Sequence, residues 1–255
     1  MGSFVLPLLC LCCWPADGCA RRAEGSYLYR PAYCLDEVLR GPPEPYVPQP
    51  MHGMPILAII VCYTGKPEEG EAAIKPLLDL GPVMNMTQTM PYVEVQKLIE
   101  GGNQPGFRNY WKADMYPDLP DDAMDTLANV AAAPVSTMTA IIVQPTGGQV
   151  HRVAEDASAM GWRSSKWAVH ILGMWEGDPI LDEKNIAWVR DVNAAMERWR
   201  QTGTYLNYLM DEGEQRVRDS FGPHYDRMVA LKNKYDPTNL FRLNQNIRPT
   251  VNGNR

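Results

Sequence analysis

Two strand-like segments follow one another without a helix between them, and this succession narrows the choice of fold. Residues 136–144 and 166–175 are apolar and rich in β-branched or aromatic side chains, and the turn-forming stretch PTGGQV (145–150) lies between them. Parallel neighbours in a sheet require a long crossover connection, usually a helix. The sequence therefore predicts an α+β fold, with an antiparallel or mixed sheet and helices packed on one face.

Other patterned segments supply the remaining elements of this fold. Apolar, β-branched runs predict strands at 56–63 and 109–116, and a short strand at 204–210. Apolar residues at helical spacing, with proline or acidic residues near the start, predict helices at 67–80, 121–133, 182–200 and 223–235. Pro76 is expected to kink the first of these helices because it removes a backbone donor.

A run of six prolines within residues 41–55 predicts a boundary, because neither a helix nor a central strand continues through it. Residues 1–50 differ in composition from the rest, and we expect an atypical leader that is poorly ordered or mispredicted. Five of the six cysteines lie in this leader: Cys10, Cys12, Cys13, Cys19 and Cys34. Disulfides therefore cannot cross-link the rest of the protein. A zinc site there would lack the usual two-residue gap between paired ligands, and we predict no metal.

The apolar segment 4–14 has the length of a signal-peptide core. No Lys or Arg precedes it and Pro7 interrupts it, so export stays open and the compartment is either cytoplasmic or secreted. The segment is too short to span a bilayer as a helix, and we expect no membrane anchor.

The charge balance argues against a nucleic-acid partner. The formal net charge is −6, and no dense cluster of Lys and Arg offsets it. Paired carboxylates at Asp121-Asp122 and Asp211-Glu212 stand at predicted helix starts, where acidic residues are common, so a hydrolase with a carboxylate pair has little support.

The last residues do not have the composition of a solvated tail. Segment 233–249 combines apolar residues such as Leu240, Phe241 and Ile247 with amide side chains such as Asn244 and Asn246. Amides can donate and accept hydrogen bonds, and they need partners when they are buried. The segment is therefore expected to contact a polar group inside an apolar setting.

Two motifs near the C-terminus resemble those of a known family. YDPTNLFRLNQNIRP (235–249), preceded by GTYLNY (203–208) with a helix between them, resembles the C-terminal signature of the berberine bridge enzyme-like FAD-linked oxidases, relatives of para-cresol methylhydroxylase and vanillyl-alcohol oxidase. Residues 107–115, 151–175 and 56–80 resemble parts of that family's substrate domain. The resemblance implies a substrate-binding sheet domain at 51–202 and a C-terminal segment at 203–255 that faces a flavin.

The resemblance also implies site residues. Tyr205, Asn207, Asn244 and Asn246 would approach the FAD cofactor, and Tyr208 matches the position of a catalytic phenol in several relatives. The alternatives are structural: asparagine often caps or bonds backbone, and tyrosine is common in half-buried strands.

As a base near neutral pH, a tyrosine needs a lowered pKa or a group that takes its proton in turn. Asp114 and Asp211 are candidates for that group. His151 and His170 are weaker candidates for a catalytic base.

The family's FAD domain has no counterpart in residues 1–50, which hold no glycine-rich run after a strand. We expect either a truncated or mispredicted product, or one piece of a split enzyme whose FAD domain is a separate polypeptide. In the first case Leu240, Phe241 and Ile247 would form an exposed apolar patch.

The sequence thus indicates a partial FAD-dependent oxidoreductase that oxidises a small alcohol, sugar or phenolic metabolite. The alternative is a non-catalytic ligand-binding or interaction module derived from such an oxidase.

Overall fold

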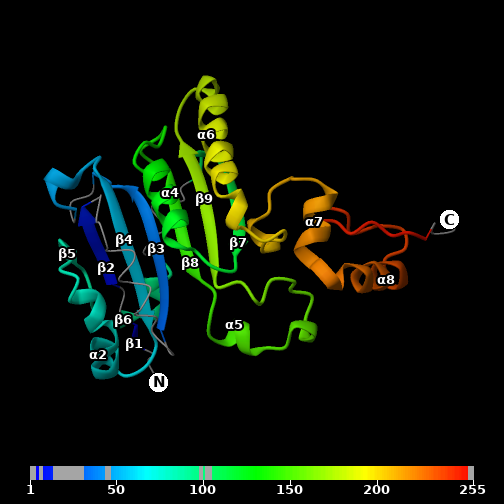
Figure 1. The fold of residues 1–255 in the computed structure, drawn as a ribbon, viewed down its shortest axis with the longest axis horizontal. Coiled ribbons are helices and arrows are strands. Elements are labelled where there is room, and N and C mark those ends of the chain that lie inside the picture. The colour runs from blue at the N-terminus through cyan, green and yellow to red at the C-terminus, as the bar shows by residue number, and fades with distance from the viewer. Residues whose placement is uncertain are drawn as a thin grey trace.

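The structure, a computed structural model, describes residues 4–5, 8–13, 32–43, 47–97, 100 and 105–251, with side chains from Val38 onward. Its centre is a seven-stranded sheet in the order β5-β2-β4-β3-β8-β9-β7, and every described pair is antiparallel (Figure 1). Its strands are β2 (Leu8–Cys13), β3 (Ala32–Arg40), β4 (Pro55–Tyr63), β5 (Met84–Asn85), β7 (Arg108–Tyr116), β8 (Ala140–Pro145) and β9 (Trp167–Trp175). Two short strands, β1 (Phe4–Val5) and β6 (Met90–Pro91), form a separate pair.

The helices accompany this sheet, as expected for an α+β fold, and the predicted fold class is confirmed. They are α2 (Pro67–Leu78), α3 (Tyr92–Val95), α4 (Asp121–Ala131), α5 (Gln149–Arg152), α6 (Asp182–Ala195), α7 (Glu214–Phe221) and α8 (Tyr225–Tyr235). Short 3-10 turns lie at Gln49–Met51, Glu155–Ala157, Pro179–Leu181, Glu197–Trp199, Leu206–Tyr208 and Gly222–His224.

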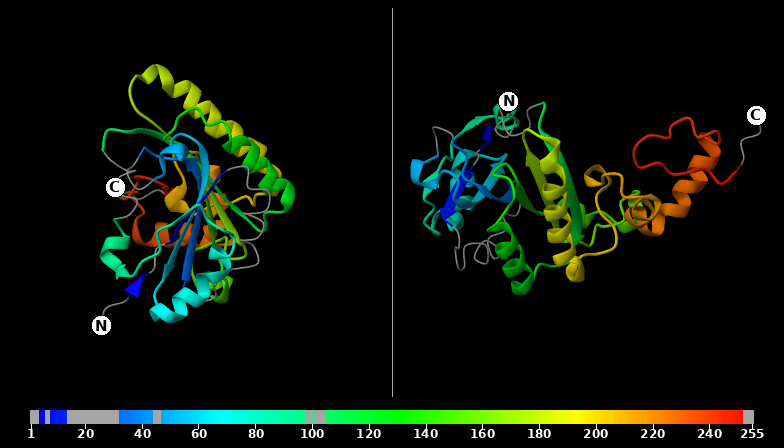
Figure 2. Two further views of the ribbon diagram at one scale, coloured as in Figure 1. Left: turned by 90° about the vertical axis from the view of Figure 1, so that its left-hand side faces the viewer. Right: turned by 90° about the horizontal axis from the view of Figure 1, so that it is seen from above.

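Helices α4 and α6 pack on one face of the sheet (Figure 2). Strand β9 presents Trp167, Val169 and Ile171 to a large core cluster, which also contains Leu127 of α4 and Val189 of α6. This face is here called the helix face. The period-2 alternation of β9 produces it, because every second side chain of a strand points to the same side.

The proline run joins two neighbouring strands of one sheet. Strand β3 ends at Arg40 before the run, strand β4 begins at Pro55 after it, and the two pair over their full lengths. Prolines suit such a connection because it needs no ladder donors. The thiol-rich segment likewise contributes strand β2, which pairs with β4. Residues 14–31 of the predicted leader, Cys19 included, lie outside the described residues.

Two expectations need correction. Residues 204–210 contain a 3-10 turn at Leu206–Tyr208 instead of a strand. The helix expected to reach residue 200 ends at Ala195 and continues only as a 3-10 turn. Among the described residues, no helix is long and apolar enough to cross a membrane.

Helices α7 and α8 lie beyond the end of the sheet, at the opposite end of the molecule from α2 (Figure 1). A small core of its own holds this part together, built from Leu209, Val217, Phe221 and Ile247. The tail after α8 contains two residues with left-handed backbone, Asn239 (φ 55°) and Asn244 (φ 58°). Asparagine tolerates this conformation better than most residues.

Candidate functional site

The face of the sheet opposite α4 and α6, here called the open face, carries the candidate site. Antiparallel pairing places Ala113 opposite His170 and Gln144 opposite Ala168, and the alternation of β9 puts His170 and Ala168 on the side away from Val169. Tyr205 and Tyr208 pack against a cluster on this face that contains Ala168. The open face therefore brings Tyr208 close to polar groups of two strands.

Tyr208 is held there by contacts of its hydroxyl, its ring and its backbone. Its hydroxyl donates a hydrogen bond to Oε1 of Gln144 at 3.0 Å. Its ring stacks on His170 with centroids 4.9 Å apart, and Tyr205 meets it edge-on at 5.1 Å. Nε1 of Trp111 donates to the Tyr208 carbonyl oxygen at 2.9 Å. All of these partners are uncharged near pH 7.

The surroundings favour the neutral forms of both rings. Burial lowers the pKa of His170 to about 4. Burial, followed by the nearby Tyr205, raises the pKa of Tyr208 above its usual value. Tyr208 is thus a protonated phenol whose proton points at Gln144, and the lowered pKa that a tyrosine base needs is absent from this environment.

Neither aspartate proposed as a proton acceptor contacts Tyr208. Asp114 lies on the helix face, where its carboxylate bonds Asn193, Arg200 and Arg216, so the proposed pairing with Tyr208 is wrong. Asp211 has an exposed side chain. His151 bonds the Ser165 carbonyl oxygen at 2.5 Å, a contact that favours a structural role.

The C-terminal tail lies against the segment that carries Tyr208. Gln245 donates from Nε2 to the carbonyl oxygen of Leu209, and Ile247 packs on Leu209. Oδ1 of Asn246 is buried without a hydrogen-bond partner in the described structure, whereas Asn244 is exposed. Asn207 donates to the Tyr205 hydroxyl. Of the four predicted cofactor residues, Tyr205, Asn207 and Asn246 therefore lie in or beside this contact; their role toward a flavin stays a prediction.

Several large apolar side chains of the tail face solvent. Leu240 is 69% exposed, Phe241 77% and Leu243 83%. Ile247 is buried, so its place in the predicted patch is wrong. Asp236 holds this turn by accepting from the backbone N–H groups of Leu240 and Phe241. The turn thus displays apolar groups on a defined backbone.

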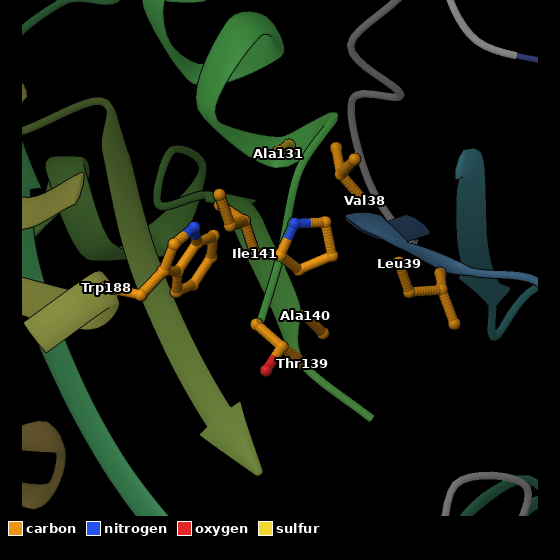
Figure 3. A pocket seen from close by; sticks show the side chains of 8 residues that line it. Val38, Leu39, Ala131, Thr139, Ala140, Ile141 and Trp188 are labelled. Carbon is orange, nitrogen blue, oxygen red and sulfur yellow. The ribbon is translucent and has the colours of Figure 1, made fainter. Parts of the chain in front are cut away.

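On the helix face, by contrast, Figure 3 shows a hollow lined mainly by apolar side chains, among them Val38, Ile141 and Trp188. It has room for no more than about one water molecule. Within the described part of the chain, no group of three or more His, Cys, Asp or Glu side chains is placed to hold a metal ion. The open face therefore remains the candidate site.

The low pKa of His170 predicts a pH dependence of stability. Between pH 6.5, the usual histidine value, and pH 4 the unfolded chain binds a proton at His170 and the folded chain does not. Full stability is therefore expected above pH 6.5, and it falls as the pH falls toward 4. The expected loss is about 3 kcal/mol over this window. Urea unfolding at several pH values measures it, and His170→Phe should flatten the slope. An equally steep slope in that variant would rule out His170 as the source.

Sequence reasoning missed Gln144 and Trp111 and ranked His170 low. A usable signal was present: Ile142, Gln144, Ala168 and His170 alternate with core residues on two strands expected to be neighbours. The position of Tyr208 above them depends on a long-range contact between segments about 40 to 60 residues apart in sequence, which a local pattern does not encode.

Comparisons with known proteins agree with this architecture. The family model described as "Berberine and berberine like" matches residues 204–248. An FAD-linked oxidoreductase of Dictyostelium discoideum is 28% identical over 200 residues, which cover 77% of this chain and 43% of the relative. Aclacinomycin-N/aclacinomycin-A oxidase of Streptomyces galilaeus is 30% identical over 121 residues, 40% of this chain and 22% of the relative.

Solved structures share the fold. The structure of BBE-like 28 from Arabidopsis thaliana matches with a TM-score of 0.81 at 14% identity, over 97% of this chain and 57% of that one. The carbohydrate oxidase from Microdochium nivale, in complex with a substrate analogue, matches with a TM-score of 0.71 at 20% identity, over 98% of this chain and 56% of that one. The chain thus spans about half the length of the proteins that it resembles.

Proposed function

We propose, from the premise that this chain belongs to the berberine bridge enzyme-like family of FAD-linked oxidases, that it forms the substrate-binding wall and the flavin-facing C-terminal segment of an oxidase. The substrate is a small hydroxylated molecule: an alcohol, a sugar or a phenolic metabolite. The observation that carries this proposal is the group of uncharged side chains around Tyr208 on the open face.

The contacts of Tyr208 support a neutral, ring-shaped substrate. Tyr205, Tyr208 and Trp111 offer aromatic surface, to which flat or pyranose rings bind well. Gln144 is the described hydrogen-bond partner of the phenol, and His170 beneath it is neutral near pH 7. A charged substrate group placed here would lose its hydration without gaining a counter-ion.

The tail fits the polar parts of a flavin. Oδ1 of Asn246 is buried and unpartnered, so a ligand donor would relieve the cost of an unsatisfied acceptor. Tyr205, Asn207, Asn244 and Asn246 are the residues that would hold the cofactor. A bound FAD would supply a hydride acceptor at N5, and its reduced form would pass the two electrons on to dioxygen to give peroxide.

Tyr208 acts on the reacting hydroxyl of the substrate. Because its own proton is directed at Gln144, its oxygen retains lone pairs that accept a hydrogen bond from that hydroxyl. This contact orients the carbon that loses the hydride. Since burial raises the pKa of the phenol, full proton transfer to Tyr208 is favoured only where a partner group lowers that pKa.

The remainder of the cofactor site belongs to a part of the protein that this chain does not contain. The Dictyostelium relative is matched over only 43% of its length. The exposed side chains of Leu240, Phe241 and Leu243 offer apolar surface for that part, whether it is continuous with this chain or a separate polypeptide.

A chimera tests the proposal: the portion of the Dictyostelium relative that this chain does not match is placed before this chain. We expect the chimera to bind FAD and to produce peroxide with neutral sugars, alcohols or phenols, and much less with their carboxylated analogues. A chimera that holds FAD but forms no peroxide with any of these compounds would support the non-catalytic binding module instead.

A further inference from the structure

Residues 200–216, here called the strap, cross the edge of β7 and carry Tyr208 on their way. We propose that Asp114 is a positioning residue that fastens both ends of the strap and thereby sets the place of Tyr208 over the open face. This inference rests on the proposed function for its catalytic meaning, but its structural content is tested without a flavin.

Asp114 is a buried carboxylate with three described donors. It is 1% exposed, and it accepts hydrogen bonds from Nδ2 of Asn193 at 2.6 Å, from Arg200 at 3.1 Å and from Arg216 at 2.6 Å. Arg200 is the first residue of the strap and Arg216 the last. One carboxylate therefore closes a loop of the chain, and it does so with charge-assisted hydrogen bonds, which are stronger than neutral ones.

Asp114 and Tyr208 lie on opposite faces of the sheet. Asp114 pairs with Val169, whose side chain belongs to the helix-face core. The preceding residue of β7, Ala113, pairs with His170, on which Tyr208 stacks. The strap thus starts on the helix face, crosses the edge strand, reaches the open face at Tyr208 and returns. Asp114 has no described contact with Tyr208, so any influence passes through the strap.

The strap is also fixed along its course. The backbone N–H of Gln201 donates to the Met115 carbonyl oxygen at 2.9 Å, and Arg216 donates to the Thr202 carbonyl oxygen at 2.8 Å. Beyond Tyr208, Glu212 forms an ion pair with Lys112 of β7.

Gly203 lies so close to α7 that a Cβ there would stand 2.5 Å from the Asp219 carbonyl oxygen. A strap held this tightly transmits a displacement of its ends, because packed segments have few alternative positions.

Removing the charge of Asp114 leaves Arg200 and Arg216 close together without their shared counter-ion. Such breakage of a buried pair is strongly unfavourable, and the two strap ends are expected to separate. Tyr208 then moves relative to His170. The stacked ring contact is the sensitive reporter of this movement, since an aromatic ring strongly shifts the NMR signals of atoms above its face.

The test records the imidazole C–H signals of His170 in the full chain. Tyr208→Leu defines the signal without the stacked ring. We expect Asp114→Asn to move the His170 signal toward that endpoint. The matched control is Asp182→Asn, which breaks the Arg108–Asp182 pair at the other end of β7 and should leave the signal in place.

A second variant covers the case in which Asp114→Asn does not fold. Arg216→Gln removes the fastening at the second end of the strap, together with the bond to the Thr202 carbonyl oxygen, and keeps the contact of Arg200 with Asp114. It should move the His170 signal in the same direction, with Arg108→Gln as its control. A folded Asp114→Asn or Arg216→Gln protein with an unchanged His170 signal would overturn the inference.

The flavin-loaded chimera adds the catalytic readout. There, Asp114→Asn should lower kcat in an otherwise normal protein but cause no further loss in a protein that already carries Tyr208→Phe, because both changes act on one phenol. Additive losses would contradict action through Tyr208. If the His170 signal moves as expected while the chimera lacks turnover, the proposed function fails and the strap inference stands.

Discussion

Replacing Tyr208 by phenylalanine should lower kcat of the flavin-loaded chimera by about 10²-fold, the order of loss expected when a group that orients the reacting hydroxyl is removed. The phenyl ring still stacks on His170, so the shape of the open face is retained. The lost feature is the hydroxyl between Gln144 and the substrate. Initial rates of peroxide formation with saturating substrate measure the effect.

The free energy of unfolding shows whether the loss of turnover comes from damage to the fold. Tyr208→Phe removes one hydrogen bond and leaves Oε1 of Gln144 unpartnered, which costs about 1 to 2 kcal/mol. The matched control is Tyr116→Phe on the helix face, because the Tyr116 hydroxyl is buried and has no described hydrogen-bond partner. Tyr116→Phe should leave turnover unchanged. Equal turnover in the Tyr208 variant and the parent chimera would exclude Tyr208 from the chemistry.

Truncating Ile171 to alanine should lower the free energy of unfolding by about 2 to 5 kcal/mol, the usual cost of a cavity at a fully buried isoleucine. Ile171 is 1% exposed and belongs to the core that joins the sheet to α4 and α6. The fold around it is densely packed, since the hollow nearby admits no more than about one water molecule. Urea unfolding followed by circular dichroism provides the measurement.

The chain offers a control of identical chemistry. Ile180 is 79% exposed in the turn before α6, so Ile180→Ala removes the same atoms from a solvated position. Its expected effect lies within about 0.5 kcal/mol. Comparable losses at Ile171 and Ile180 would mean that the helix face is not the core of this protein.

Period-2 and period-3.6 patterns predicted strands β4, β7, β8 and β9 and helices α2, α4, α6 and α8. Strands β4, β7 and β9 begin and end within a residue or so of the segments expected from apolar runs, because a buried strand needs apolar side chains on the face that packs. Helix α4 starts at Asp121, where proline followed by two aspartates indicates a helix N-terminus.

The proline run was interpreted as a domain boundary because a local pattern records that a strand ends, not which strand pairs next. Strand β3 contains charged residues such as Asp36, Glu37 and Arg40, and its place in the sheet follows from pairing with β4 and β8. Pairing of distant segments is a tertiary property that propensity does not report.

The sequence predicted Tyr208 as a site residue but not its contacts with Gln144 and Trp111. The motif around Tyr208 drew attention to residues 203–208, and Gln144 and His170 stand on predicted strands. Asp114 was expected to serve Tyr208 directly. The strap crosses the edge of β7, so the carboxylate and the phenol occupy opposite faces, and only the three-dimensional path of residues 200–216 reveals this.

The absorption spectrum of the isolated 255-residue chain, taken after incubation with FAD and gel filtration, most directly tests whether this polypeptide supplies one wall of a flavin site whose greater part lies elsewhere. We expect the chain to emerge with far less than one flavin per molecule, whereas the chimera retains a full complement. A stoichiometric flavin band on the isolated chain would contradict the account.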